Sequence, residues 1–349
     1  MKYLNLLVLF FAFVIINSCS DDNTTNPSGD GLKVAAIIDL SAHYSQFGIE
    51  AKQAMDLALK DARNIQIEYY DSKADLATSD KLLDSIIKKG DTKVVVTLAS
   101  WISNGLAQKI NNNNMLQIAI GSAVFDYASL NSCVRLTGDV SSESKYLSEE
   151  LKKYNKIGVL YFNNDYGKGW FNTLSSVLGN KIIAAESYTD TQTDFTTPLN
   201  KVNAKNPDVI VLISTREAVD IIRQARNLGI NAQFIGTRPT LTNQLLAEPL
   251  AEGMMFSYPD LDESISFYQL FKSTYSYRMS AFGAEGYDLV KTLDQAYQNN
   301  NKDRNVLFTN YRNKSVNGAL GKIKFDANAQ ADYDFTLMVI KNRTWEEVK

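Results

Sequence analysis

The sequence predicts an α/β protein made of two doubly wound, Rossmann-like lobes. Apolar runs typical of buried parallel strands alternate with segments whose apolar residues recur at helical spacing. This alternation covers residues 33–121 and then restarts at residue 156. The chain has 349 residues, of which 45% are hydrophobic and 21% charged, so it is long enough for two well-developed cores. Two successive βα arrays of similar length therefore indicate two lobes.

The N-terminal segment is typical of secretion. After a short positive start, residues 4–16 form an apolar run too short for a convincing membrane-spanning helix. The tetrapeptide Ile16-Asn17-Ser18-Cys19 resembles the lipobox of bacterial lipoproteins, although a small residue is more common at the position of Asn17. The resemblance implies that residues 1–18 are a signal peptide cleaved before Cys19, whose thiol is then lipidated. An ordinary cleaved signal peptide is the alternative interpretation.

The composition beyond this segment favours a tethered, extracytoplasmic protein. Residues 19–31 are polar and have the composition of a solvated tether, so the globular part is expected to begin near Leu32. The formal net charge is -3 and the pI is about 5.4, so the chain lacks the basic surface that a nucleic-acid partner requires. A DNA-binding repressor is excluded because a secretion signal stands where a helix-turn-helix would be.

The first array predicts a parallel sheet whose strands end in candidate site residues. Its strands are expected at 33–40, 65–69, 94–98 and 115–121, and its helices around 51–62, 82–87 and 104–111. The third strand ends in Ser100 and Trp101. Ligands of open α/β sheets bind at the carboxyl ends of the strands, so these two residues are candidates for the site. Trp101 fits either a cleft wall or a core residue beneath the following helix.

The second array predicts a sheet of similar construction. Its strands are expected at 156–162, 182–185, 208–213, 233–237 and 253–258, and its helices at 170–178, 195–204 and 217–228. Aromatic-rich helices follow at 264–279 and 284–298. A final strand pair is expected at 323–325 and 335–340.

The order of these elements, together with several local motifs, resembles the type I periplasmic binding proteins, specifically the leucine/isoleucine/valine-binding branch of ABC-transporter receptors. The resemblance extends from Lys33 to about Ile340, and the joint order of its motifs is more specific than any one of them. The segments that carry it are Gln46-Phe47-Gly48, Leu98-Ala99-Ser100, Asp165-Tyr166-Gly167, 222–229, Phe234-Ile235-Gly236, 251–254, Gly286-Tyr287-Asp288 and 321–326.

The resemblance implies two lobes joined by a three-strand hinge, which close on a ligand held between them. It places the three crossovers near residues 137–140, 257–261 and 316–321. One lobe would then consist of residues 32–138 plus 259–318. The other would consist of residues 139–258 plus 319–349.

The resemblance also implies which side chains contact the ligand. Ser100 and the pair Ser122 and Ala123 match positions that hold a ligand carboxylate, with help from backbone N–H groups at a helix start. Tyr44 and Phe47 match an aromatic turn that packs over the ligand. Second-lobe and hinge-side contacts fall at Tyr166 and Tyr287.

Two departures from the family pattern change the expected ligand. Arg238 stands where the family has the Glu that receives an amino-acid ammonium, and a ligand-contacting Tyr aligns with Ser214 or Thr215, followed by Arg216. A guanidinium favours paired contacts with a carboxylate, so we expect a carboxylate or other anion without a nearby ammonium. Alternatively, both arginines are surface residues and a different acid receives an ammonium.

The cysteines and the single histidine give no support for catalysis or a cofactor. Cys133 is expected to be a small buried residue, because nothing marks it as a partner of His43. The disulfide common in branched-chain receptors would fall near Ala74 and at Ala99, so both of its cysteines are missing. No transition-metal site is expected, although carboxylates alone could hold calcium.

The function expected from these patterns is binding without chemistry. The dinucleotide, P-loop and nucleophile-elbow motifs are missing, which argues against a doubly wound enzyme. We expect a lipoprotein that captures a small carboxylate-bearing ligand and delivers it to an ABC permease. A lipid-anchored sensor that feeds a signalling partner and a classical branched-chain amino-acid binder remain alternatives.

Overall fold

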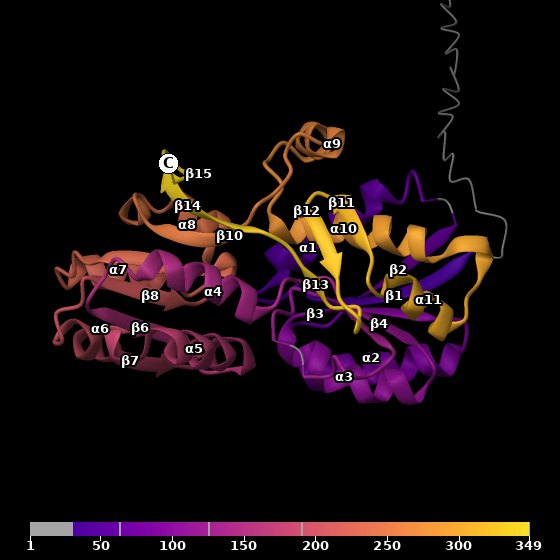
Figure 1. The fold of residues 1–349 in the computed structure, drawn as a ribbon, viewed down its shortest axis with the longest axis horizontal. Coiled ribbons are helices and arrows are strands. Elements are labelled where there is room, and N and C mark those ends of the chain that lie inside the picture. Colours follow the sequence, from indigo (N-terminus) through magenta and orange to yellow (C-terminus); the bar gives the residue numbers. More distant parts are fainter. Residues whose placement is uncertain (1–30, 63, 125, 190, 349) are drawn as a thin grey trace, which may run out of the picture.

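The computed structural model describes residues 31–348 apart from residues 63, 125 and 190, and Figure 1 shows them as two α/β lobes side by side. This confirms the predicted fold class. The expected signal peptide, Cys19 and the tether up to residue 30 lie outside the described residues. Within the described part of the chain, no helix is long and apolar enough to cross a membrane.

The first lobe contains a parallel sheet of five strands in the order β2-β1-β3-β4-β5. The short strand β5 was not predicted, because three residues carry too little periodicity to be recognised. The strands are β1 (Leu32–Ile38), β2 (Ile65–Asp71), β3 (Val94–Leu98), β4 (Leu116–Ile120) and β5 (Cys133–Arg135), and the helices between them are α1 (Ser45–Ala58), α2 (Leu76–Lys89) and α3 (Ser100–Asn112).

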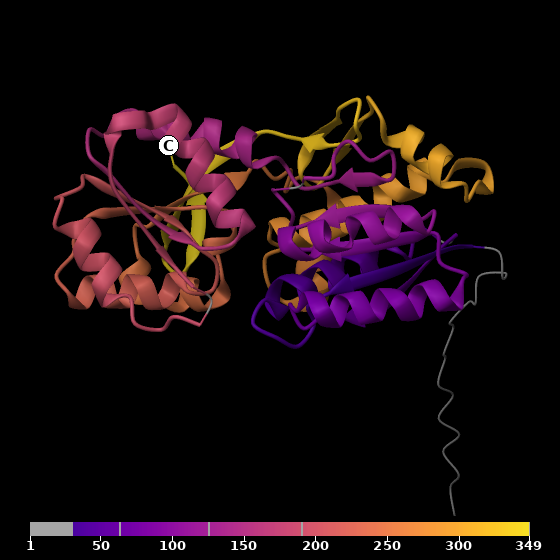
Figure 2. The same cartoon turned by 90° about the horizontal axis from the view of Figure 1, so that it is seen from below.

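The second lobe contains a sheet of seven strands in the order β15-β14-β10-β9-β8-β6-β7, with helices on both of its faces (Figure 2). The strands from β6 to β10 run parallel, and β14 and β15 add an antiparallel edge. The elements up to β10 are α4 (Val140–Leu151), β6 (Ile157–Phe162), α5 (Asp165–Leu178), η1 (Gly179–Lys181), β7 (Ile182–Tyr188), α6 (Thr196–Asn203), β8 (Val209–Ile213), α7 (Ala218–Asn227), β9 (Gln233–Gly236), η2 (Arg238–Thr240), α8 (Asn243–Ala247), η3 (Pro249–Ala251) and β10 (Met255–Pro259).

The chain then returns to the first lobe before it ends in the second. A three-stranded sheet in the order β11-β12-β13 packs with the first lobe. In the second lobe β14 pairs with β10, and β15 pairs with β14. These elements are α9 (Ser266–Tyr275), α10 (Ala281–Ala296), η4 (Gln298–Asn300), α11 (Arg304–Tyr311), β11 (Ser315–Gly318), β12 (Gly321–Phe325), β13 (Ala331–Asp332), β14 (Phe335–Lys341) and β15 (Thr344–Glu347).

The lobe boundary predicted at residue 319 is wrong, because the chain stays in the first lobe beyond that residue. Ala319, Ile323 and Tyr333 are buried in the same core as the first sheet, so residues 319–333 belong to the first lobe. The third crossover therefore lies at residues 333–335 and not at 316–321. The predicted final strand pair is also wrong, because β12 pairs with β11 and β13 whereas β14 pairs with β10 and β15.

In each lobe the backbone of one helix touches the backbone at a strand end: α1 lies against the end of β1, and α5 lies against the end of β6. A Cβ atom at Gly48 would lie 1.8 Å from the carbonyl oxygen of Asp39, and one at Gly167 would lie 1.8 Å from that of Phe162. Only glycine fits such an approach. The two glycines therefore bring the turns beside them, including Tyr44, to the carboxyl edges of the two sheets.

A buried carboxyl group fixes the start of α10 against α1. Glu50 lies on α1, is 4% exposed and accepts a hydrogen bond from the Ser280 hydroxyl at 2.6 Å. The backbone N–H of Ala281 donates to the Tyr258 hydroxyl at 2.7 Å. Burial raises the pKa of Glu50 to about 7.

We expect the free energy of unfolding to fall as the pH rises through the pKa of Glu50. The folded state holds a proton on this carboxyl that the unfolded chain releases near the ordinary glutamate pKa of 4.5, so the stabilisation is complete below that pH and is lost as the pH rises through about 7. Between pH 5.5 and 8 the change is about 2 kcal/mol. Urea unfolding of the wild type and Glu50→Gln at both pH values measures it. Equal pH dependence in the two proteins would contradict this assignment.

Candidate functional site

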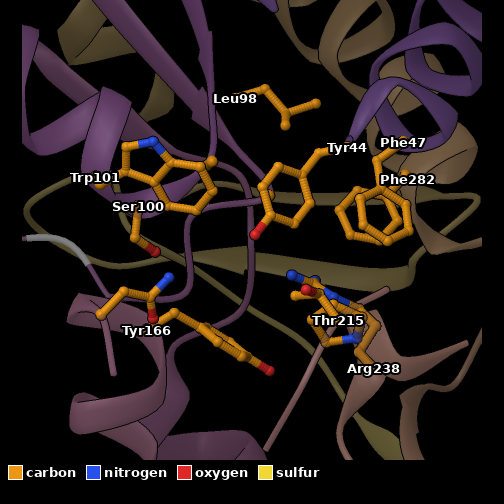
Figure 3. Close-up of a pocket in the computed structure, with 13 residues that line it drawn as sticks. Tyr44, Phe47, Leu98, Ser100, Trp101, Tyr166, Thr215, Arg238 and Phe282 are labelled. Atoms are coloured by element: carbon orange, nitrogen blue, oxygen red, sulfur yellow. The ribbon is translucent and has the colours of Figure 1, made fainter. Parts of the chain in front are cut away.

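A cavity lies between the lobes, where the carboxyl ends of both sheets meet (Figure 3). The space not filled by protein atoms is about 450 Å³, including the part that is open to solvent. The first lobe contributes its lining from the β1–α1 turn, the start of α3, the end of β4 and α10, and the second lobe contributes the rest. The lining residues are Tyr44, Phe47, Leu98, Ala99, Ser100, Trp101, Gly121, Asn164, Tyr166, Thr215, Arg238, Pro239 and Phe282.

The cavity brings together most of the candidate residues. Those that line it are Tyr44, Phe47, Ser100, Trp101, Tyr166, Thr215 and Arg238. Trp101 forms part of the cavity wall and is also half-buried against the first-lobe core, so both interpretations of this residue apply in part.

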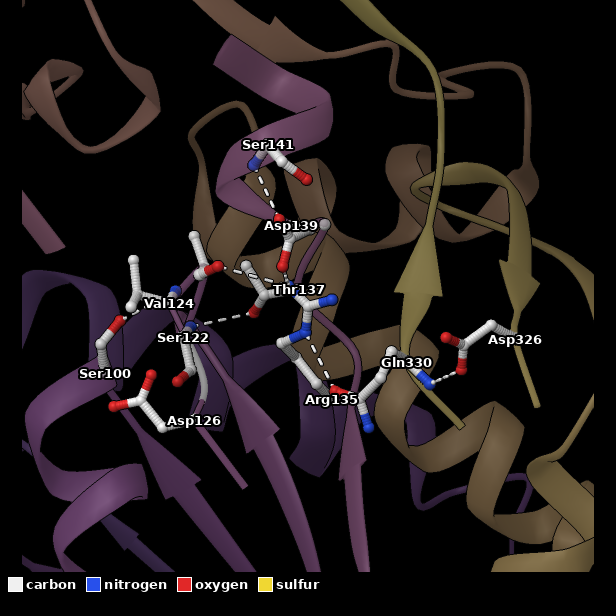
Figure 4. Close-up of polar contacts among 12 residues, drawn as sticks. Ser100, Ser122, Val124, Asp126, Arg135, Thr137, Asp139, Ser141, Asp326 and Gln330 are labelled. Atoms are coloured by element: carbon white, nitrogen blue, oxygen red, sulfur yellow. Dashed lines mark hydrogen bonds and ion pairs between the residues drawn. The ribbon is translucent and has the colours of Figure 1, made fainter. Parts of the chain in front are cut away.

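Three candidates do not line the cavity. Ser122 and Ala123 turn into the first crossover, where the Ser122 N–H donates to the Thr137 hydroxyl at 3.1 Å and the Ala123 carbonyl accepts from Arg135 at 3.3 Å (Figure 4). The preceding residue, Gly121, takes their place in the lining. Tyr287 stacks on Phe267 with ring centroids 4.0 Å apart, away from the lining residues.

The start of α3 presents hydrogen-bond donors to the cavity. No side chain caps this helix, and its N-cap residue Ala99 has a φ of 84°, a left-handed conformation that is strained for alanine. Ser100 opens the helix, and its hydroxyl oxygen accepts only a long hydrogen bond of 3.4 Å from the Val124 N–H. The first-turn N–H groups, the helix dipole and this hydroxyl together suit a negatively charged group.

Aromatic rings form the apolar walls. Tyr44 and Trp101 have ring centroids 5.4 Å apart, and Phe47 stacks on Phe282 with centroids 4.2 Å apart. Tyr166 enters from the second lobe and donates its hydroxyl to Thr237 at 2.8 Å. An apolar or aromatic ligand body fits between such walls.

Arg238 lines the cavity but is not a free cation. Its side chain is 2% exposed, and its Nη1 donates to Glu285 at 2.8 Å and to the Tyr333 hydroxyl at 3.2 Å. The guanidinium lies over the Phe282 ring, 5.2 Å from its centroid. The Nε atom has no hydrogen-bond partner among the described residues. The alternative that Arg238 is a surface residue is therefore wrong, and one edge of its guanidinium is already paired.

Arg216 has a different environment. Its side chain is 35% exposed and its Nε lies 3.2 Å from the Glu217 carboxylate. It lines a neighbouring crevice with His43, Phe47 and Asp220, and of these residues only Phe47 also lines the main cavity. Arg216 therefore does not belong to the main cavity.

Two buried glutamates surround Arg238 and connect it to the crossovers. Glu285 accepts hydrogen bonds from the Gly121 N–H at 2.6 Å and from the Thr137 hydroxyl at 3.1 Å. Glu143 accepts from the Ser257 hydroxyl at 2.6 Å and from the Arg238 N–H at 3.3 Å.

The pKa shifts in this network follow from burial and from the ion pair. Burial raises the pKa of Glu143 although the positive charge of Arg238 opposes the shift. Burial alone would lower the pKa of Arg238, but the Glu285 carboxylate reverses the effect, so the pKa lies above its ordinary value. Arg238 is therefore positively charged at any physiological pH.

Two polar or aromatic lining residues, Asn164 and Phe282, were missed by the sequence analysis for different reasons. Asn164 caps α5 by accepting a hydrogen bond from the Gly167 N–H at 2.9 Å, and an Asn before a helical segment is a recognisable capping signal. Phe282 reaches the cavity because α10 packs against α1. No local pattern reveals that placement.

The lining lacks the acidic groups that an ammonium or a metal ion would need. None of the described residues that line the cavity is Asp or Glu. Among the described residues, no group of three or more His, Cys, Asp or Glu side chains is placed to hold a metal ion. The polar side-chain groups of the lining are hydroxyls, one amide, one indole N–H and one guanidinium.

A family model described as periplasmic binding protein matches residues 31–344. The chain belongs to this family. Its members are solute-binding receptors rather than enzymes. A search of curated proteins finds no match.

Solved structures share the fold of this family member. An extracellular ligand binding receptor from Desulfohalobium retbaense has 28% identity and a TM-score of 0.86, with 91% of this chain and 59% of that chain covered. LivJ from Streptococcus pneumoniae, solved with isoleucine, has 20% identity and a TM-score of 0.84 over 91% of this chain and 99% of its own. An ABC-transporter solute binding protein from R. palustris, solved with benzoate, has 15% identity and a TM-score of 0.84 over 91% and 95%.

We expect Glu285→Gln to destabilise the protein strongly, because it removes the counter-charge of a buried guanidinium. The expected loss is about 3 kcal/mol, in the range measured when one partner of a buried ion pair is removed. Urea unfolding at pH 7 measures it. Glu263→Gln is the matched control, since Glu263 pairs with Arg278 at the surface, and it should cost less than about 1 kcal/mol. Equal effects of the two substitutions would contradict a structural role for the buried pair.

Proposed function

We propose that this protein is an extracytoplasmic solute-binding lipoprotein that captures a small carboxylate-bearing molecule between its lobes for import by an ABC permease. The observation that carries the proposal is the polarity of the cavity. Its lining offers the uncapped start of α3, the Ser100 hydroxyl and the guanidinium of Arg238, but no carboxylate. A ligand carboxylate can therefore accept hydrogen bonds from these groups.

The same polarity disfavours a free amino acid. An ammonium group buried in the cavity would lack a carboxylate among the described lining residues and would approach the guanidinium of Arg238. Burying an unpaired charge costs several kcal/mol. The fold itself accommodates both kinds of ligand, since related structures contain isoleucine and benzoate. Of the two, we propose that this protein binds an organic acid without an ammonium group.

Capture works by closure of the lobes without a chemical step. Contacts across the lobes include the Arg238–Glu285 ion pair at 2.8 Å and a hydrogen bond of 3.2 Å from the Asn243 N–H to the Gln46 side chain. A ligand that touches both lobes stabilises the closed arrangement because an open one offers it only half of its contacts. Ser100 would bind from the first lobe and Thr215 from the second.

The delivery partner and the anchor are inferred from the sequence and the family. Cys19 in its lipobox-like tetrapeptide supports a lipid anchor, and the polar tether supports a receptor that moves near a membrane. The named ABC-transporter relatives support a permease as the partner. A sensor for a signalling partner is the alternative, and a neighbouring gene for a kinase instead of a permease would favour it.

We expect calorimetric titration of the ligand-stripped protein to show binding of benzoate and no binding of leucine. Arg238→Lys should weaken benzoate binding by about tenfold, because lysine preserves the charge beside Glu285 but lacks the planar guanidinium that pairs with a carboxylate. Arg278→Lys, at the surface, is the matched control and should bind benzoate as the wild type does. Micromolar binding of leucine would overturn the proposal in favour of a classical branched-chain amino-acid binder.

A further inference from the structure

The start of α5 faces the start of α3 across the main cavity. Ser100 on α3 and Tyr166 on α5 lie on facing sides of this cavity (Figure 3). Val124 contacts both helices, because its N–H donates to the Ser100 hydroxyl at 3.4 Å and a Cβ atom at Gly169 would lie 2.6 Å from one of its methyl carbons. The N-termini of two helices, one from each lobe, therefore converge on the same part of the cavity.

The two helix starts differ in how they are capped. The start of α3 has no side-chain cap, whereas α5 is capped by Asn164, whose Oδ1 accepts a hydrogen bond from the Gly167 N–H at 2.9 Å. Capping uses the acceptor of this amide and leaves its donor, Nδ2, without a hydrogen-bond partner among the described residues. Asn164 is half-buried and lines the cavity. The polar group that it offers to a ligand is therefore an N–H donor whose orientation is fixed by the cap.

The surroundings of this donor favour a negatively charged acceptor. Both helix N-termini contribute positive potential, and the first turn of α3 adds backbone N–H groups. The acidic residue in the first turn of α5, Asp165, is exposed and does not line the cavity. No carboxylate is found among the described lining residues, so a ligand has to supply the anionic acceptor.

We propose that Asn164 is a specificity-determining residue, whose Nδ2 donates a hydrogen bond to the ligand carboxylate that Ser100 and the start of α3 hold. This inference rests on the proposed function and deepens it. The first lobe binds one oxygen of the carboxylate and Asn164 binds the other, so a single group of the ligand joins the two lobes. A ligand that presents a donor at this point is rejected, because two donors would then face each other without an acceptor.

The test compares benzoate with benzamide in calorimetric titrations of the ligand-stripped protein. The two molecules have nearly the same shape, but benzamide carries an amino donor in place of one carboxylate oxygen. The wild type should bind benzoate at least about tenfold more tightly. Asn164→Asp should reverse this preference. Aspartate caps a helix as well as asparagine does, and its second oxygen repels benzoate but accepts a hydrogen bond from benzamide.

Two further variants separate contact with the ligand from other effects. Asn163→Asp is the matched control, because it adds the same charge at an exposed neighbouring side chain that does not line the cavity. It should retain the wild-type preference. Asn164→Ser keeps a cap but lacks the amide donor, so it should weaken benzoate binding by about tenfold without favouring benzamide. Urea unfolding of all three variants should match the wild type, since the cap of α5 is preserved.

The outcomes separate the two proposals. If the wild type does not bind benzoate, the proposed function fails. If it binds benzoate but Asn164→Asp leaves the ratio of the two affinities unchanged, or if Asn163→Asp reverses that ratio as well, Asn164 does not contact the carboxylate and the carboxylate receptor stands. If Asn164→Asp does not fold, unchanged benzoate affinity in Asn164→Ser would overturn the inference in the same way.

Discussion

The ion pair between Arg238 and Glu285 is the interaction on which the rest of the site depends. It joins the second lobe to the first at 2.8 Å, and both side chains are almost fully buried. Burying two charges is costly unless their remaining donors and acceptors are satisfied. Glu285 accepts hydrogen bonds from Gly121 and Thr137, which satisfy much of its carboxylate. The buried Nε of Arg238 has no hydrogen-bond partner among the described residues.

The position of this pair links ligand binding to the hinge. Thr137, Ser257 and Tyr333, which contact the pair or its neighbour Glu143, lie on or next to the three crossovers between the lobes. The Asp260 N–H also donates to the Asp334 carbonyl at 2.9 Å, which holds two crossovers together. A ligand at Arg238 therefore meets the element that sets the relation between the lobes.

The sequence predicts the parts of this protein that local patterns encode. Periodicity locates most of the strands and helices. The end of β3 indicates Ser100 and the family resemblance indicates Tyr44, and both residues line the cavity. The pairing of Arg238 with Glu285 could not be predicted, because the two residues are far apart in the chain and meet only through the packing of α10. The third crossover was misplaced for a related reason. The turn after β11 is compatible with a crossover or with the hairpin that forms, and only burial of Ile323 in the first core distinguishes them.

The account's central claim is that the cavity holds a carboxylic acid without an ammonium group. Its most direct test is mass spectrometry of the small molecule released on denaturing protein purified from its native source. The account predicts an organic acid that contains a carboxylate and an apolar body but no amino group. A released α-amino acid would contradict it.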